Sequence, residues 1–170
     1  MLRAMKEQLK ILALDEDKRF HNILRERIGK KATGLLENRL KQLIILMPDL
    51  VERIHYYYGH LQKDNSITKK LGGYMLTYLY HPTDFIREEE WGLFGYLDDA
   101  YFVAVVFEKV IAEVSVEDQL LIEPDKRFNE SLKLLKASTR SVIPEEASKI
   151  DNMIQDIVKG EEAGFLNLFR

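Results

Sequence analysis

The sequence predicts an all-α protein, a compact bundle of about seven or eight helices, and three observations support this prediction. Apolar residues recur at intervals of three and four along most of the chain, which places them on one face of a helix. The 170 residues, 46% of them hydrophobic, can supply one substantial core. No stretch rich in proline, glycine or serine divides the chain, so we expect residues 1–170 to form a single helical domain.

Two helices are expected within residues 2–28. Apolar residues spaced by three and four lie on either side of the acidic residues 15–17. They are Leu2, Met5, Leu9 and Leu12 in the first helix, and Phe20, Ile23, Leu24 and Ile28 in the second. The acidic residues suit the positive N-terminal end of the second helix.

The longest apolar stripe predicts helix over residues 36–61. Its members are Leu36, Leu40, Leu43, Ile44, Met47, Leu50, Val51, Ile54, Tyr58 and Leu61. The stripe keeps its phase across Pro48, so this proline either kinks one long helix or begins a second. Asn65 and Ser66 can cap the next helix, which runs through Leu79 and contains two glycines that would let a neighbouring backbone come close.

Residues 81–97 lose the helical period, which predicts an irregular connection with an apolar content too high for a fully solvated loop. Asp98 and Asp99 then introduce the run from Ala100 to Phe107, which is apolar on every side. Such a run fits a buried strand or a central helix, and the helical periodicity around it favours the helix.

The last two helices are each expected to carry a proline in the first turn. Pro124 precedes a stripe of Phe128, Leu132 and Leu135, and Pro144 precedes a stripe of Ala147, Ile150, Ile154 and Ile157. Gly160 ends the second of these helices. It leaves an apolar tail, residues 165–169, that we expect to dock on the chain's own core.

Charge is unevenly divided along the chain. Residues 1–81 carry 15 basic and 9 acidic side chains, whereas residues 82–170 carry 10 basic and 19 acidic ones. The halves would therefore attract each other or bind different partners. The overall charge of -3 argues against a strongly basic nucleic-acid binder, although Arg25, Arg27, Lys30 and Lys31 form a candidate basic patch.

The location expected for this chain is the cytoplasm. The chain has no cysteine, which excludes disulfides, thiolate nucleophiles and cysteine-ligated metals. Its first residues lack the apolar core of a signal peptide, and no run of apolar residues is long enough to span a membrane. Contact with a membrane surface would depend on the apolar Trp91, Leu93 and Phe94. It is the least favoured interaction, because the acidic residues 88–90 would repel anionic lipid.

One segment carries a family pattern. It contains Pro82-x-Asp84, followed by Gly95-x-x-Asp98-Asp99 and an apolar helix, and it resembles the small prokaryotic YkvA-like family, a domain of unknown function. The resemblance implies two helices joined by this loop, with a core segment of about residues 66–114. Where that family has a second Pro-Asp, this chain has Arg87-Glu88. The resemblance brings no established activity.

The aspartates of this segment have two interpretations. As structural residues, Asp84, Asp98 and Asp99 would accept hydrogen bonds from backbone amides in the loop and at the start of the apolar helix. As functional residues they would converge with His81 and one of the acidic residues 88–90 on a divalent cation, the only cofactor that the sequence suggests. Organisation of the loop is the favoured interpretation.

Other catalytic patterns are missing or incomplete. Glu52-x-x-His55 has the spacing of a di-iron ligand pair, but such sites need the motif twice. The sequence contains no phosphate-binding glycine loop and no Gly-x-Ser-x-Gly elbow. We therefore expect a non-enzymatic helical module that binds a protein, most simply a second copy of itself. The alternatives are a divalent-metal enzyme using Asp84, Asp98 and Asp99, and a nucleic-acid-binding accessory protein using the basic N-terminal half.

Overall fold

Helices are the regular elements of the part of the chain that the structure describes. The structure is a computed structural model, which describes residues 2–14, 18–60, 66–80, 85–113, 119–161 and 165. These residues form α1 (Leu2–Ala13), α2 (Arg19–Ile28), η1 (Gly29–Lys31), α3 (Gly34–His60), α4 (Ser66–Leu79), α5 (Glu88–Trp91), η2 (Gly92–Tyr96), α6 (Leu97–Ala112), α7 (Gln119–Val142) and α8 (Pro144–Lys159). The predicted all-α bundle is confirmed.

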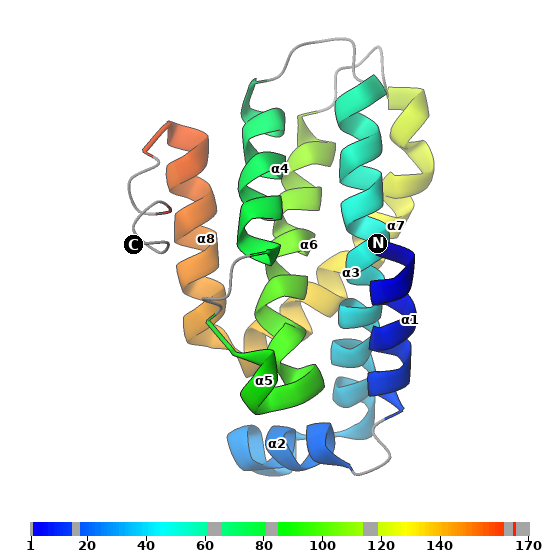
Figure 1. Cartoon of the computed structure of the whole chain (residues 1–170), viewed down its shortest axis with the longest axis vertical. Coiled ribbons are helices and arrows are strands. Elements are labelled where there is room, and N and C mark those ends of the chain that lie inside the picture. Colours follow the sequence, from blue (N-terminus) through cyan, green and yellow to red (C-terminus); the bar gives the residue numbers. More distant parts are fainter. Residues whose placement is uncertain are drawn as a thin grey trace.

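Helix α6 runs through the middle of the bundle and packs against α3, α4, α7 and α8 (Figure 1). Thirteen of its sixteen residues are buried. A helix that is apolar on every side needs a partner on every side, which explains its central position. The predicted central helix is confirmed, and the two acidic residues in its first turn, Asp98 and Asp99, are buried with it.

The N-terminal helices cover one side and one end of this core. Helix α1 packs along α3, and α2 lies across the lower end of the bundle in Figure 1. Leu9 is the buried residue of α1, and Phe20, Ile23 and Leu24 are those of α2. Both helices are therefore amphipathic and pack their apolar faces on the core, as their apolar spacing predicts.

Helix α3 is continuous through Pro48, so the stripe belongs to one helix. The predicted apolar residues from Leu40 to Ile54 are all buried. Beyond them the stripe passes to Tyr57, which is 2% exposed, whereas the predicted Tyr58 is only partly buried. Tyr58 still packs against the core, as predicted, because the positions three and four residues after Ile54 both lie near the same face of the helix.

The connection before α6 is more regular than its sequence pattern predicts. Within residues 85–97, four residues form α5 and the next five form η2. Gly92, the first residue of η2, has a positive φ of 58° and ends α5. Elements this short contain too few turns to show a helical period, so they read as irregular in the sequence.

The two prolines of the last helices differ in position. Pro144 lies in the first turn of α8, as predicted. Pro124 does not begin a helix, because α7 starts at Gln119, and the prediction is wrong there. Gly160 ends α8 in a left-handed conformation with φ 83°, as predicted.

The C-terminal tail returns to the core at Phe165. This side chain is 1% exposed, and its ring meets the ring of Tyr74 on α4 edge to face, with 4.4 Å between centroids. The expected docking on the chain's own core is thus observed at Phe165. The rest of the tail lies outside the described residues.

We predict that Gly72→Ala destabilises the fold while Gly73→Ala does not. A Cβ at Gly72 would lie 1.5 Å from the hydroxyl oxygen of Tyr58, whereas a Cβ at Gly73 would have no neighbour within 4 Å. Chemical unfolding should show a loss of about 1–2 kcal/mol for Gly72→Ala, and Gly73→Ala should gain up to about 1 kcal/mol of helix propensity. Equal stability of the two variants would refute the close approach of α3 and α4.

Candidate functional site at the start of α6

Asp98, in the first turn of α6, is a buried polar residue of the family-like segment with several hydrogen-bond partners. Its carboxylate is fully buried, and its Oδ2 atom accepts three hydrogen bonds. The Tyr78 hydroxyl donates one at 2.9 Å, and the backbone amides of Phe85 and Ile86 donate the others at 3.0 and 3.2 Å. Asp98 therefore joins the end of α4, the connection after it and the start of α6.

These bonds hold the connection before α6, and the backbone amides of Asp98 and Asp99, in the first turn of α6, also stabilise the charged carboxylate. The residue before α6, Tyr96, makes no side-chain capping hydrogen bond. The amides of Phe85 and Ile86 lie outside any helix and have no ladder partner, so Asp98 supplies the acceptor that they need. Asp98 thereby holds the connection in place for α5 and η2.

Burial makes the charge on Asp98 unfavourable. It raises the pKa of this carboxyl to about 6, against the hydrogen bonds from Tyr78 and Ile86, which act in the opposite direction. Burial and the nearby Asp98 charge also raise the pKa of the Tyr78 hydroxyl, so Tyr78 acts as a donor at any ordinary pH. The second carboxylate oxygen, Oδ1, is buried and has no hydrogen-bond partner within the part of the chain that is described.

This raised pKa predicts how stability depends on pH. The folded state holds the Asp98 proton more tightly than the unfolded chain, where the pKa is near the ordinary 3.8, so the contribution of Asp98 is largest below about pH 4 and lost as pH rises through 6. Urea unfolding of wild type and Asp98→Asn should show wild type losing stability relative to the variant over this interval. A difference that does not change with pH would contradict the prediction.

Two other residues of the family-like segment, Gly95 and Asp99, are also buried. Gly95 is buried, and a Cβ on it would lie 2.5 Å from the Cα of Glu88, so η2 packs directly on the backbone of α5. Asp99 is 3% exposed. Pro82 and Asp84, together with His81, lie outside the described residues.

The described residues do not form a metal site. Among the described residues, no three histidine, aspartate or glutamate side chains are grouped so that they could hold a metal ion. Glu89 and Glu90, two acidic candidates beside Asp98 in sequence, are largely exposed and pair with Arg87. Glu52 and His55, on α3, are both exposed.

The candidate basic patch splits into two parts. Arg27 faces the chain itself: its guanidinium lies 5.5 Å from the ring centre of Trp91 and 3.5 Å from a carboxylate oxygen of Glu146. Arg25, Lys30 and Lys31 are exposed. Arg27 is thus a packing residue that fastens α2 to α5 and α8, and the other three remain available.

The apolar residues of the connection are also accounted for. Leu93 and Phe94 are buried, and Trp91 is partly buried beneath Arg27. These side chains, on which contact with a membrane would have depended, pack inward. In addition, no described helix combines the length and apolar character that crossing a bilayer requires.

Among the ion pairs formed by the described residues, few join the two halves of the chain. Where both partners of an ion pair are described, Arg27–Glu146 joins the two halves, and the others connect residues of the same half.

One polar cluster had no sequence signal. The Tyr101 hydroxyl on α6 donates to Asp151 on α8 at 3.1 Å, and Arg140 on α7 donates to the Tyr101 oxygen at 3.0 Å and pairs with Asp151. Tyr101 lies 39 positions before Arg140 and 50 before Asp151, so no local spacing could reveal the cluster. They fasten α6, α7 and α8 together.

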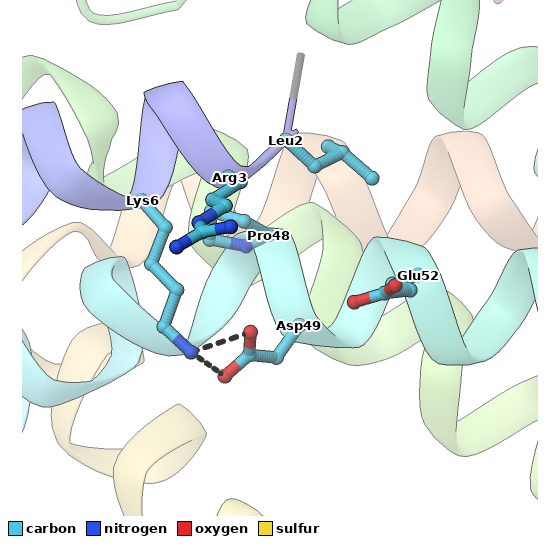
Figure 2. A pocket seen from close by; sticks show the side chains of 6 residues that line it. All are labelled: Leu2, Arg3, Lys6, Pro48, Asp49 and Glu52. Atoms are coloured by element: carbon cyan, nitrogen blue, oxygen red, sulfur yellow. Dashed lines mark hydrogen bonds and ion pairs between the residues drawn. The ribbon is translucent and has the colours of Figure 1, made fainter.

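A second feature that the sequence did not indicate is a pair of adjoining hollows beside α3. The larger, of about 270 Å³, is lined by Leu2, Arg3, Lys6, Pro48, Asp49 and Glu52 (Figure 2). Figure 2 shows Lys6 reaching from α1 to both carboxylate oxygens of Asp49, at 2.7 and 2.5 Å. The smaller, of about 60 Å³, is lined by Leu2, Met5, Met47, Pro48, Val51, Leu76, Leu79 and Tyr80. Together they form a groove between α1 and α4, with α3 as its floor.

Comparisons with known proteins found no match. No family model, no curated protein and no solved structure is similar to this chain.

Proposed function

We propose that this protein is a non-enzymatic helical interaction module that binds a second copy of itself. The observation that carries the proposal is the distribution of exposed apolar side chains. Among the described residues, eight large apolar side chains are exposed, and seven of them lie on α1, α3 and α4 or in the turns that follow α1 and α4. They are Ile11, Leu12, Leu14, Leu35, Tyr56, Leu76 and Tyr80, and the eighth is Leu134 on α7.

The use of the family-like segment within the fold supports a role without catalysis. Asp98 accepts three hydrogen bonds from within the chain, and Gly95 packs closely against α5. A catalytic carboxylate must reach a substrate, whereas Asp98 is fully buried. The segment then serves to build the core that presents the binding surface.

The groove between α1 and α4 supports self-association through this side of the bundle. Its floor is apolar, formed by Met47, Pro48 and Val51, and Leu76 stands on its α4 wall with 38% exposure. Two copies related by a two-fold axis could each place Leu76 against the groove of the other.

Sedimentation velocity over a range of protein concentrations tests the proposal. We expect reversible association of the wild type, weakened at least tenfold by Leu76→Glu, because a charge would be buried in an apolar contact. Leu134→Glu is the matched control, since Leu134 is exposed on α7, and it should associate like the wild type. A wild type that stays monomeric at every concentration overturns the proposal.

We further propose membership of the YkvA-like family and a cytoplasmic location. The arrangement of α4 and α6, joined by a connection that Asp98 holds, supports the family proposal, because the resemblance implies two helices joined by this loop. The absence of cysteine supports the location.

A further inference from the structure

The end of the bundle where α1 finishes and α3 begins carries aliphatic side chains that the core does not use. Ile11 and Leu14, at the end of α1, are 68% and 69% exposed, and Leu35, in the first turn of α3, is 63% exposed. Figure 1 shows this end of α1 and the start of α3 together at the lower end of the molecule. Lys30 and Lys31 precede Leu35 by five and four residues, and Arg39 follows it by four. These six residues are called the end surface.

Helical geometry shows why Leu35 is left uncovered. Leu35 and Asp49 are fourteen residues apart in α3, close to four full turns, so they lie on the same face of the helix. Lys6 of α1 binds Asp49, which places α1 along that face. Between Lys6 and Ala13, α1 rises only about 10 Å, whereas α3 extends about 21 Å from Asp49 to Leu35. Helix α1 therefore ends before it reaches Leu35.

The charged side chains of the end surface have one sign. Lys30 and Lys31 are exposed in η1, directly before α3, and Arg39 is partly buried one turn after Leu35. Within the described residues none of the three takes part in an ion pair or hydrogen bond, in contrast to Lys41, whose ammonium pairs with Glu37 at 2.8 Å. These cations are therefore available to pair with carboxylates of a partner.

We propose that the end surface binds an acidic amphipathic helix of a partner protein. Aliphatic side chains of that helix would cover Leu35, Ile11 and Leu14, and its carboxylates would pair with Lys30, Lys31 and Arg39. The aliphatic content favours a protein over a nucleic acid, which would call for aromatic side chains to stack on its bases. This inference assigns Ile11, Leu14 and Leu35, which were counted above among the exposed apolar residues, to a partner protein, and it leaves the α1–α4 groove with Leu76 as the contact for self-association.

Fluorescence anisotropy with a designed probe tests the proposal. The probe is a labelled amphipathic peptide of about 18 residues with a leucine stripe flanked by glutamates, and its comparison peptide carries lysine in place of each glutamate. We expect the full chain to bind the acidic peptide and not the basic one. Lys30→Glu/Lys31→Glu and Leu35→Ser should each weaken binding about tenfold or more, which corresponds to about 1.4 kcal/mol.

Matched controls lie on the last two helices. Leu134→Ser removes an equally aliphatic exposed side chain from α7, and Lys159→Glu reverses an exposed charge on α8; both should bind the acidic peptide like the wild type. Circular dichroism checks that each variant is folded. The Leu76→Glu variant is measured in parallel, so that loss of self-association and loss of peptide binding are read separately.

Three results would overturn the proposal. The first is absence of binding to the acidic peptide, and the second is equal weakening by the end-surface variants and their controls. The third is binding of anionic phospholipid vesicles or single-stranded DNA at the end surface while the peptide stays free, which would assign that surface to another class of partner.

Discussion

Gly95→Ala is expected to lower the free energy of unfolding by about 3 kcal/mol, at the upper end of the usual effect of overpacking. A Cβ at this position would lie 2.5 Å from the Cα and 2.7 Å from the backbone nitrogen of Glu88. Because the obstructing atoms belong to the backbone, no rotamer change can relieve the contact. Relief requires α5 and η2 to separate, which would also disturb Phe94 in the core. Thermal and urea unfolding measure the loss.

Gly73→Ala is the control for this experiment. It makes the same chemical change in a helix where the new methyl group meets nothing within 4 Å. A large loss in Gly95→Ala with no loss in Gly73→Ala attributes the effect to the contact between η2 and α5. If Gly95→Ala unfolds at the wild-type urea concentration, η2 does not rest on the α5 backbone as described.

Local periodicity was sufficient to predict most of the helices. Helix α6 is apolar on all sides, and such a helix has one stable place, the centre of the core. The end of α8 at Gly160 is equally local, because a left-handed residue at φ 83° favours glycine. For Pro124 the local rule is wrong: a proline fits the first turn of a helix best, but α7 begins five residues before it, at Gln119.

The partners of the site residues could not be predicted in the same way. Asp98 was singled out by its spacing, but its partners Tyr78, Phe85 and Ile86 lie 12 to 20 residues earlier. Such contacts depend on how α4 and α6 pack, which no local pattern describes. The same holds for Arg27, whose charge suggested a binding surface and whose guanidinium lies against Trp91.

Asp98→Ala is expected to have the largest effect of any single substitution in the segment, about 4 kcal/mol. The substitution removes the oxygen that accepts hydrogen bonds from the Tyr78 hydroxyl and from the backbone amides of Phe85 and Ile86. All three donors then lose their acceptor. Asp98→Asn keeps an oxygen that can accept the same hydrogen bonds, so its loss should be far smaller. Amide hydrogen exchange gives a local readout: the Phe85 and Ile86 amides should exchange faster in the alanine variant than in the asparagine variant.

A double-mutant cycle separates this role from metal binding. Tyr78→Phe removes one of the donors, so adding Asp98→Ala to it should cost less than Asp98→Ala alone, because fewer groups are then left unpaired. If Asp98 acts through hydrogen bonds alone, magnesium or manganese leaves the unfolding midpoint of every variant unchanged. Stabilisation of the wild type by either ion, lost in both Asp98→Ala and Asp98→Asn, would instead mean that the buried carboxylate serves a cation, since the asparagine preserves the hydrogen bonds and removes only the charge.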